Sequence, residues 1–145
     1  LRMVTPIGHV VEVMKIPRLT RLPGVRDWVL GVANVRGRLL TVVDTHRYLG
    51  AAPTVPRASW RVLIVDDGEL VVGLVVEQSL GLQYFLTDSF EDEVPDSVGT
   101  MRRHVSGAYR NAGRVYYVTN LLSLVRDDEF FDVAPAASQP AASPR

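Results

Sequence analysis

The stretch WVLGVANVRGRLLTVVD, residues Trp28 to Asp44, decides the fold of this chain. Apolar and mostly β-branched residues run from Trp28 to Val35 and again from Leu39 to Val43, with a short break around Gly37. Two such runs joined by a short turn are typical of a β-hairpin, and glycine adopts a positive φ there with little strain. The sequence therefore predicts a largely buried hairpin that turns at Gly37.

The same pattern recurs along the chain. The Asp-Gly pair at residues 67 and 68 favours a tight turn between two apolar runs. The chain also holds 24 Val against 16 Leu and 3 Ile, and this excess of β-branched side chains favours strands. The further predicted strands are Trp60 to Val65, Leu70 to Val76, Leu80 to Leu86, Val105 to Arg110 and Arg114 to Thr119.

Three helical segments are predicted. The apolar spacing from Ile7 to Met14 is that of one helical face, and Pro6 and Pro17 bound it. A single helical turn is predicted for His46 to Leu49. A final helix is predicted from Leu121 to about Phe131, because the preceding Asn120 is a good N-cap.

The length and the turn spacing indicate a small, mainly β protein. A chain of 145 residues with 47% hydrophobic residues forms one domain or two small packed lobes. Short strands with turns every 8 to 12 residues favour small barrels or a sandwich. We expect a folded domain over residues 1–132, with loops at 50–59 and 87–100, and a disordered Ala/Pro-rich tail over 133–145.

Charge and composition exclude several classes of function. Sixteen basic and sixteen acidic residues give a net charge of zero, which argues against nucleic acid as a partner. No apolar run approaches the length of a membrane span, so direct membrane insertion is not expected. The chain contains no cysteine, which removes thiolate chemistry and fits a cytoplasmic location.

The sequence contains no recognisable catalytic or metal-binding motif. The three histidines stand at positions 9, 46 and 104, too far apart for a metal-ligand spacing. No nucleophile elbow, phosphate-binding loop or dinucleotide fingerprint is present. We therefore expect no metal, no cofactor and no enzymatic activity.

Two local features have both a structural and a functional interpretation. Asp44 and His46 follow a strand and could act as a carboxylate and an imidazole, although an aspartate there more often binds nearby backbone N–H groups. Arg36, beside the Gly37 turn, could make forked hydrogen bonds to a partner or simply decorate the turn.

The segment from Arg21 to Asp44 resembles the CheW family of chemotaxis coupling proteins. That family has an Asn-Leu-Arg-Gly turn, matched here by Asn34 to Gly37, followed by an apolar strand that ends in an Asp, here Asp44. The likeness extends over about Ile7 to Phe131. Gly81 to Phe85 and the Phe130–Phe131 pair are most similar to the PilI branch, the coupling proteins of type IV pilus chemosensory systems.

This resemblance implies a fold and a function. The fold would be two intertwined SH3-like five-stranded β-barrels with short helices. The function would be that of a non-enzymatic adaptor, which bridges methyl-accepting chemoreceptors and the regulatory domain of a CheA-type histidine kinase in receptor arrays at the inner membrane. The positions that match the receptor-facing groove are Val10 and Glu12, on the predicted first helix, and Asn34 and Arg36, at the turn.

Other interpretations remain open at this stage. The chain could be a small-ligand-binding or enzymatic β-barrel that uses Asp44 and His46 in the groove between the lobes. It could also be a CheW-like lobe from a larger kinase or a response-regulator fusion. The family has a strand before Leu1 to Thr5, and we expect its absence to leave an unpaired edge that favours strand-mediated homodimers.

Overall fold

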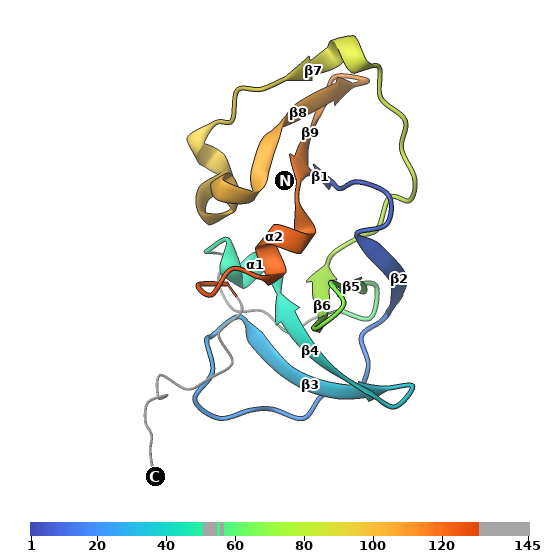
Figure 1. Ribbon diagram of the computed structural model, residues 1–145, viewed down its shortest axis with the longest axis vertical. Coiled ribbons are helices and arrows are strands. Elements are labelled where there is room, and N and C mark those ends of the chain that lie inside the picture. The colour runs from blue at the N-terminus through green and yellow to red at the C-terminus, as the bar shows by residue number, and fades with distance from the viewer. Residues whose placement is uncertain (51–54, 56, 131–145) are drawn as a thin grey trace.

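Valine-rich segments form nine strands in the described part of the chain, which is residues 1–50, 55 and 57–130 of a computed structural model (Figure 1). The strands are β1 (Met3–Val4), β2 (Val10–Lys15), β3 (Val29–Val35), β4 (Arg38–Asp44), β5 (Arg61–Asp66), β6 (Val71–Val76), β7 (Phe90–Glu91), β8 (Val105–Asn111) and β9 (Arg114–Thr119). The helical segments are α1 (Thr45–Tyr48), η1 (Thr87–Ser89), η2 (Asp96–His104) and α2 (Leu121–Val125).

The strands form two sheets, each at the centre of one lobe. The first lobe contains a five-stranded sheet in the order β2-β5-β6-β4-β3 together with α1. The second lobe contains a four-stranded sheet in the order β1-β9-β8-β7, with η1, η2 and α2. The lobes are intertwined, because β1 pairs in parallel with β9 of the second lobe while β2 pairs with β5 of the first.

The mainly β fold with few short helices is confirmed, and the three predicted hairpins are β3–β4, β5–β6 and β8–β9. The number of strands differs from that of the expected two five-stranded barrels. The second sheet has four strands, and neither sheet closes on itself by strand pairing within the described residues. In the first lobe β2 and β3 therefore remain as two facing edges.

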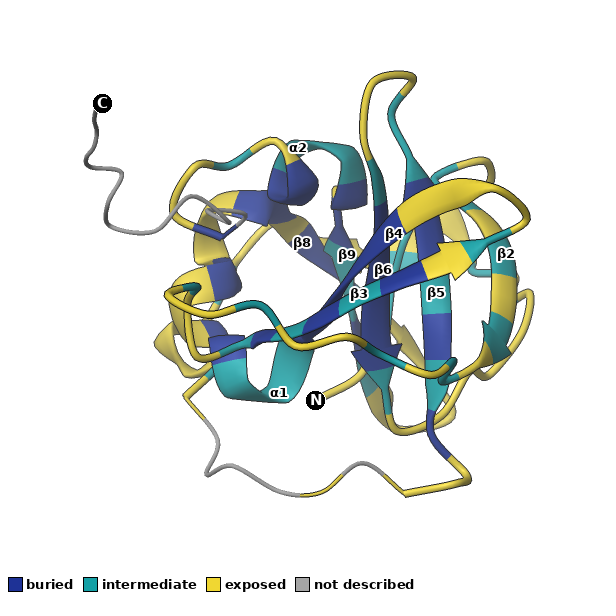
Figure 2. Cartoon of the chain, turned by 90° about the horizontal axis from the view of Figure 1, so that it is seen from below, coloured by how far each residue is buried: buried dark blue, intermediate teal, exposed yellow. Residues whose placement is uncertain are grey.

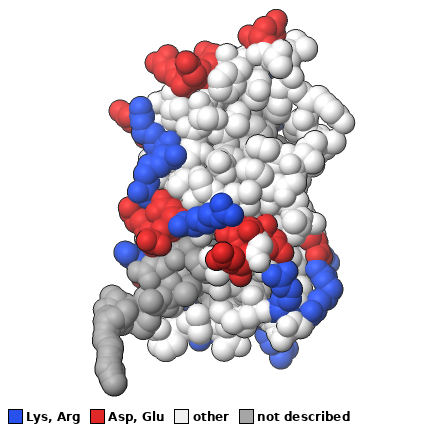
Figure 3. All heavy atoms as spheres, in the orientation of Figure 1, with Lys and Arg blue, Asp and Glu red and all other residues white. Residues whose placement is uncertain are grey.

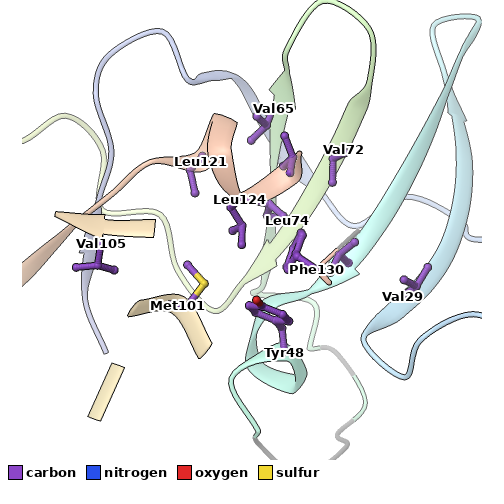
Figure 4. Close-up of a cluster of buried hydrophobic side chains, with 12 residues drawn as sticks. Val29, Tyr48, Val65, Val72, Leu74, Met101, Val105, Leu121, Leu124 and Phe130 are labelled. Atoms are coloured by element: carbon purple, nitrogen blue, oxygen red, sulfur yellow. The ribbon is translucent and has the colours of Figure 1, made fainter. Parts of the chain in front are cut away.

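The buried side chains form two hydrophobic clusters, and one of them holds the lobes together. One lies inside the first lobe and is built from Leu40, Val42, Trp60, Val62, Ile64 and Val75. The other lies between the lobes, where side chains from β4, β5, β6 and α1 meet those of η2, α2 and Phe130 (Figure 4). Tyr48 packs edge-on against both Trp28 and Phe130, and the Trp28 indole donates a hydrogen bond to the Phe130 carbonyl at 2.6 Å.

The predicted helix from Ile7 to Met14 is wrong, since residues 10–15 form β2. Burial alternates strictly along this strand (Figure 2). Val10 and Met14 have the spacing of one helical face, but Val10 packs against the cluster between the lobes and Met14 against the cluster inside the first lobe. The β-branched valines at 10, 11 and 13 favour a strand, and antiparallel pairing with β5 stabilises it.

Two further elements differ from the sequence prediction. Leu80 to Leu86 is not a strand, because it pairs with no other strand in the described part of the chain. The final helix ends at Val125, and residue 131, its expected end, lies outside the described residues. The expected tail over 133–145 and part of the loop at 50–59 also lie outside them. No helix in the described ranges is long and apolar enough to cross a membrane.

Candidate functional site

The turn between β3 and β4 presents Arg36 at the tip of a hairpin. Val35 pairs with Arg38, so that Arg36 and Gly37 form a two-residue loop with φ values of 50° and 81°. Two positive φ angles define a type I′ turn, whose twist matches that of the flanking strands. The Asn34 side chain accepts a hydrogen bond of 3.0 Å from the Gly37 N–H and so stabilises the turn.

A β-bulge in β2 determines where Glu12 points. Val10 pairs with Val65 but Glu12 pairs with Ile64, so Val11 is an extra residue on its strand. Val65 belongs to the cluster between the lobes, whereas Ile64 belongs to the cluster inside the first lobe. Directly opposite residues share a face of a sheet, so the bulge turns Glu12 toward the interior side of the first lobe.

Glu12 and Arg36 form an ion pair across the gap between the two edge strands β2 and β3. Their side chains are 36% and 67% exposed, so solvent and a partner protein can reach both. The guanidinium uses one of its nitrogens for Glu12 and keeps other N–H donors for a second acceptor. The pair therefore orients Arg36 without saturating it.

A second ion pair lies beside the first. Arg38 of β4 donates to Asp66, at the end of β5, at 2.8 Å. The Gly68 N–H, together with the Arg38 guanidinium, holds the pKa of Asp66 below its usual range. Asp66 is therefore a carboxylate at neutral pH, and this edge of the first lobe carries two arginines and two carboxylates.

These ion pairs surround a shallow cavity of about 160 Å³. We call it the rim site, and its lining residues are Val11, Glu12, Val35, Arg36, Arg38, Leu40, Ile64, Asp66 and Val71. Its floor is aliphatic and its border is charged. Val11 and the neighbouring Leu39 are exposed, so apolar area is available next to the charges. This combination is typical of a protein contact surface.

Of the residues that the sequence singled out, the structure brings together Glu12, Asn34, Arg36 and Gly37, and it separates Val10 from them. Val10 is half-buried against the cluster between the lobes, on the opposite face of the sheet from Glu12. Val10 packs β2 against that cluster and does not line the rim site. Sequence reasoning missed Arg38 and Asp66, whose pairing depends on the approach of two separate hairpins.

Asp44 is the N-cap of α1. Its side chain is 1% exposed and accepts hydrogen bonds from the backbone N–H groups of His46, at 3.0 Å, and Arg47, at 3.4 Å. The His46 ring packs against Trp60 and contacts Glu77 at 2.8 Å. One oxygen of the Asp44 carboxylate caps α1 and lies 3.5 Å from His46 Nδ1, and the other is buried, so this pair does not present an acid and a base to a ligand.

The structure also aligns Ser123, His104 and Asp127, which sequence reasoning did not connect. The His104 ring lies 2.7 Å from the Ser123 hydroxyl and 2.8 Å from the Asp127 carboxylate. Burial acts to raise the pKa of Asp127, but the Glu129 N–H, His104 and Arg103 outweigh it and hold that pKa below its usual range. His104 is 8% exposed, and the Ser123 hydroxyl also contacts the Asn120 carbonyl, so this cluster fastens α2 to η2.

No group of three or more His, Asp or Glu side chains in the described ranges has the geometry of a metal site. A second hollow, of about 260 Å³, lies in the second lobe and includes the exposed ion pair of Arg110 and Glu91. That pair resembles Arg36–Glu12 in chemistry and exposure but lies in the other lobe. It therefore provides a matched control.

Comparison with known proteins agrees with this architecture. The model of the CheW-like domain family matches residues 1–129. The protein PilI of Pseudomonas aeruginosa is 37% identical over 131 residues, which are 90% of this chain and 73% of PilI. FrzA of Myxococcus xanthus is 36% identical over 85 residues, 57% of this chain and 52% of FrzA. The crystal structure of the scaffolding protein TtCheW from Thermoanaerobacter tengcongensis superimposes with a TM-score of 0.69 at 23% identity, covering 81% of this chain and 75% of that one.

The chain thus belongs to the family of CheW-like domains, since the family model covers nearly all of the described residues. The resemblance seen in the sequence, including its similarity to the PilI branch, is confirmed by the identity to PilI. The agreement with TtCheW supports the fold alone.

Proposed function

We propose that this chain is a non-enzymatic, cytoplasmic adaptor, which couples methyl-accepting chemoreceptors to a CheA-type histidine kinase in arrays at the inner membrane. Its similarity to PilI favours a chemosensory system of the type IV pilus, and therefore a role in twitching motility. Membership of the CheW-like family supports the adaptor class. The observation that carries the receptor contact is the Arg36–Glu12 pair, held across the two edges of the first lobe.

The rim site suits the helical tip of a receptor. A helix can place apolar side chains on Val11 and Leu39, both exposed. The free N–H donors of Arg36 then bind a carboxylate or carbonyl of the receptor, a charge-assisted bond that fixes the register of the helix. Asn34 contributes by stabilising the turn that carries Arg36.

An adaptor needs a second surface for its other partner. We place the kinase contact away from the rim site, because both partners must bind at the same time. The two lobes are locked together by a shared core, so the two contact surfaces keep a fixed spacing. Such a protein functions by holding its two partners at a fixed distance from each other, and this requires no chemical step.

The proposal is tested by assembling the purified chain with a receptor tip and with a kinase regulatory domain, alone and together, and measuring complex mass by light scattering. We expect a ternary complex of equal stoichiometry. Arg36→Ala should lose the receptor only, and Arg110→Ala, the matched control, should lose neither partner. Competition between the two partners for one surface would contradict the proposal.

A small-ligand function in a groove between the lobes is the alternative, and Asp44 and His46 would supply its polar groups. The capping geometry of Asp44 argues against it. A thermal-shift screen with small metabolites measures it directly. A ligand whose stabilising effect disappears in His46→Ala would support that alternative.

A further inference from the structure

The segment Leu82–Leu86 has the burial pattern of a strand but pairs with no strand in the described part of the chain. Its residues alternate between exposed and half-buried, as they do in a strand with one face on a core. The outward residues Leu82, Tyr84 and Leu86 are large, apolar and 60%, 82% and 75% exposed. The segment leads from β6 to β7 along one side of both lobes (Figure 1).

The backbone of this segment is available for pairing. Within the described residues, its only main-chain hydrogen bond is the one that the Leu86 carbonyl accepts from the Ser89 N–H at 3.0 Å. The other N–H and C=O groups of Leu82–Leu86 have no backbone partner there. A row of such groups beside apolar side chains is a template for another strand.

The inward side chain of Phe85 holds the segment on the second sheet. Phe85 stacks on Tyr109 of β8 with ring centroids 5.0 Å apart and lies against Tyr116 of β9 at 5.2 Å. Gln83 donates to the Leu80 carbonyl at 3.1 Å. The outward face is therefore presented by an anchored backbone, which reduces the entropy lost when a partner binds.

No charge protects this edge. Residues 78–87 contain no Asp, Glu, Lys, Arg or Pro, the residue types that keep exposed strand edges from pairing. In the space-filling view, charged side chains gather over the left and the lower parts of this face and leave its upper right-hand side uncharged (Figure 3). Because this edge is uncharged, it has no electrostatic preference for a basic or an acidic partner.

We propose that Leu82–Leu86 is a homodimerisation strand, which pairs antiparallel with the same segment of a second copy about a two-fold axis at Tyr84. The pattern of the segment is self-complementary. In this register Leu82 lies opposite Leu86 and Tyr84 lies opposite Tyr84, so every outward apolar side chain meets another one. The inward Gln83 and Phe85 keep their own contacts.

This inference does not rest on the proposed adaptor function. The dimer strand follows the end of β6 and leads to β7, whereas the rim site lies at β2, β3, β4, the end of β5 and the start of β6. A dimer would double the number of rim sites in one particle and so increase binding to clustered partners. If self-association is lost, receptor binding at the rim site can still be measured, and the reverse also holds.

The absence of native cysteine allows a direct test of the two-fold axis. Residues directly opposite each other in antiparallel strands have Cβ atoms about 4.5–5.5 Å apart, close enough for a disulfide after a small adjustment. We expect Tyr84→Cys to form a disulfide-linked dimer under mild oxidation. Ile7→Cys, at an equally exposed apolar position, should remain monomeric on the same timescale. Equal rates of crosslinking for the two variants would overturn the proposal.

A second experiment tests the same register by charge. Sedimentation velocity should show a dimer of the wild-type chain whose fraction rises with concentration. Tyr84→Lys and Tyr84→Glu each place like charges opposite one another, so each should weaken self-association by at least about tenfold. Mixing the two variants should restore a dimer. A wild-type chain that stays monomeric, or variants that dimerise as it does, would show that the segment does not pair with itself.

Discussion

The Arg36 guanidinium forms an ion pair with the Glu12 carboxylate, which is 24 residues earlier in the chain, across the two edges of the first-lobe sheet. An exposed ion pair contributes about 0–1 kcal/mol to stability, so its main effect is on the position of the guanidinium. Substitutions in this pair should therefore change receptor binding more than they change stability.

Replacing Glu12 by Gln should leave stability nearly unchanged and weaken receptor binding. The variant removes the charge that orients Arg36, while the guanidinium itself remains. We expect a change in unfolding free energy of less than about 1 kcal/mol. The loss of receptor affinity should be smaller than that of Arg36→Ala, as measured by calorimetry. Glu91→Gln, in the matched pair with Arg110, should not alter receptor binding. An equal loss in both variants would contradict the role of Glu12.

Replacing Arg36 by Gly should weaken receptor binding about as much as Arg36→Ala does and preserve the fold. A non-glycine residue at a φ of 50° is strained by about 1 kcal/mol, which glycine relieves. Glycine also raises the entropy of the unfolded chain by a similar amount, about 0.4–1 kcal/mol. The two effects offset each other, so the urea midpoint should hardly move. A large loss of stability would show that Arg36 has a structural role.

Replacing Asp44 by Ala should destabilise the protein without changing receptor affinity. The carboxylate caps α1 through two backbone N–H groups. Losing such a cap costs about 0.5–2 kcal/mol. Asp44→Asn keeps an acceptor at the same place and should retain most of that stability. Denaturant unfolding measures both variants, and unchanged stability of Asp44→Ala would contradict the capping role.

Asp67 should make stability depend on pH in the acidic range. The Leu70 N–H, the Arg126 guanidinium and the Glu69 N–H lower its pKa from 3.8 to about 2. A carboxyl whose pKa is lower in the folded state stabilises it above the unfolded pKa, and loses this effect as the pH falls through the folded value. Asp67→Asn should therefore melt below the wild type at pH 6, and the difference should shrink between pH 3.8 and about 2. Asp88→Asn, at an exposed position in η1, is the control. If the difference in melting temperature between Asp67→Asn and the wild type stays constant between pH 3.8 and about 2, the low pKa of Asp67 is contradicted.

The sequence predicted the hairpins well because their signals are local. The Gly37 turn and the Asp67–Gly68 turn each separate two apolar runs, and both define tight turns in the structure. The N-cap Asn120 also begins α2 as expected, accepting from the Ser123 N–H at 3.0 Å. Turn residues and caps act over two to four residues, so no knowledge of the rest of the fold is needed.

The site was only partly predictable because its geometry is tertiary. Glu12 and Arg36 were each singled out, but their pairing depends on a bulge at Val11 that only the register with β5 reveals. The first helix was predicted wrongly because Val10 and Met14, which are spaced as on one helical face, pack on different clusters on either side of the bulge. The segment Leu80 to Leu86 has the pattern of a strand, yet pairing needs a neighbour that the described chain does not supply.

The central claim is that Arg36 binds the receptor and not the kinase. The most direct measurement is the affinity of Arg36→Ala for both partners, with its melting temperature as a control. We predict a receptor affinity weakened by about 1–3 kcal/mol, partial recovery in Arg36→Lys, an unchanged kinase affinity and an unchanged melting temperature. Unchanged receptor affinity, or an equal loss toward both partners together with a lower melting temperature, would contradict the account.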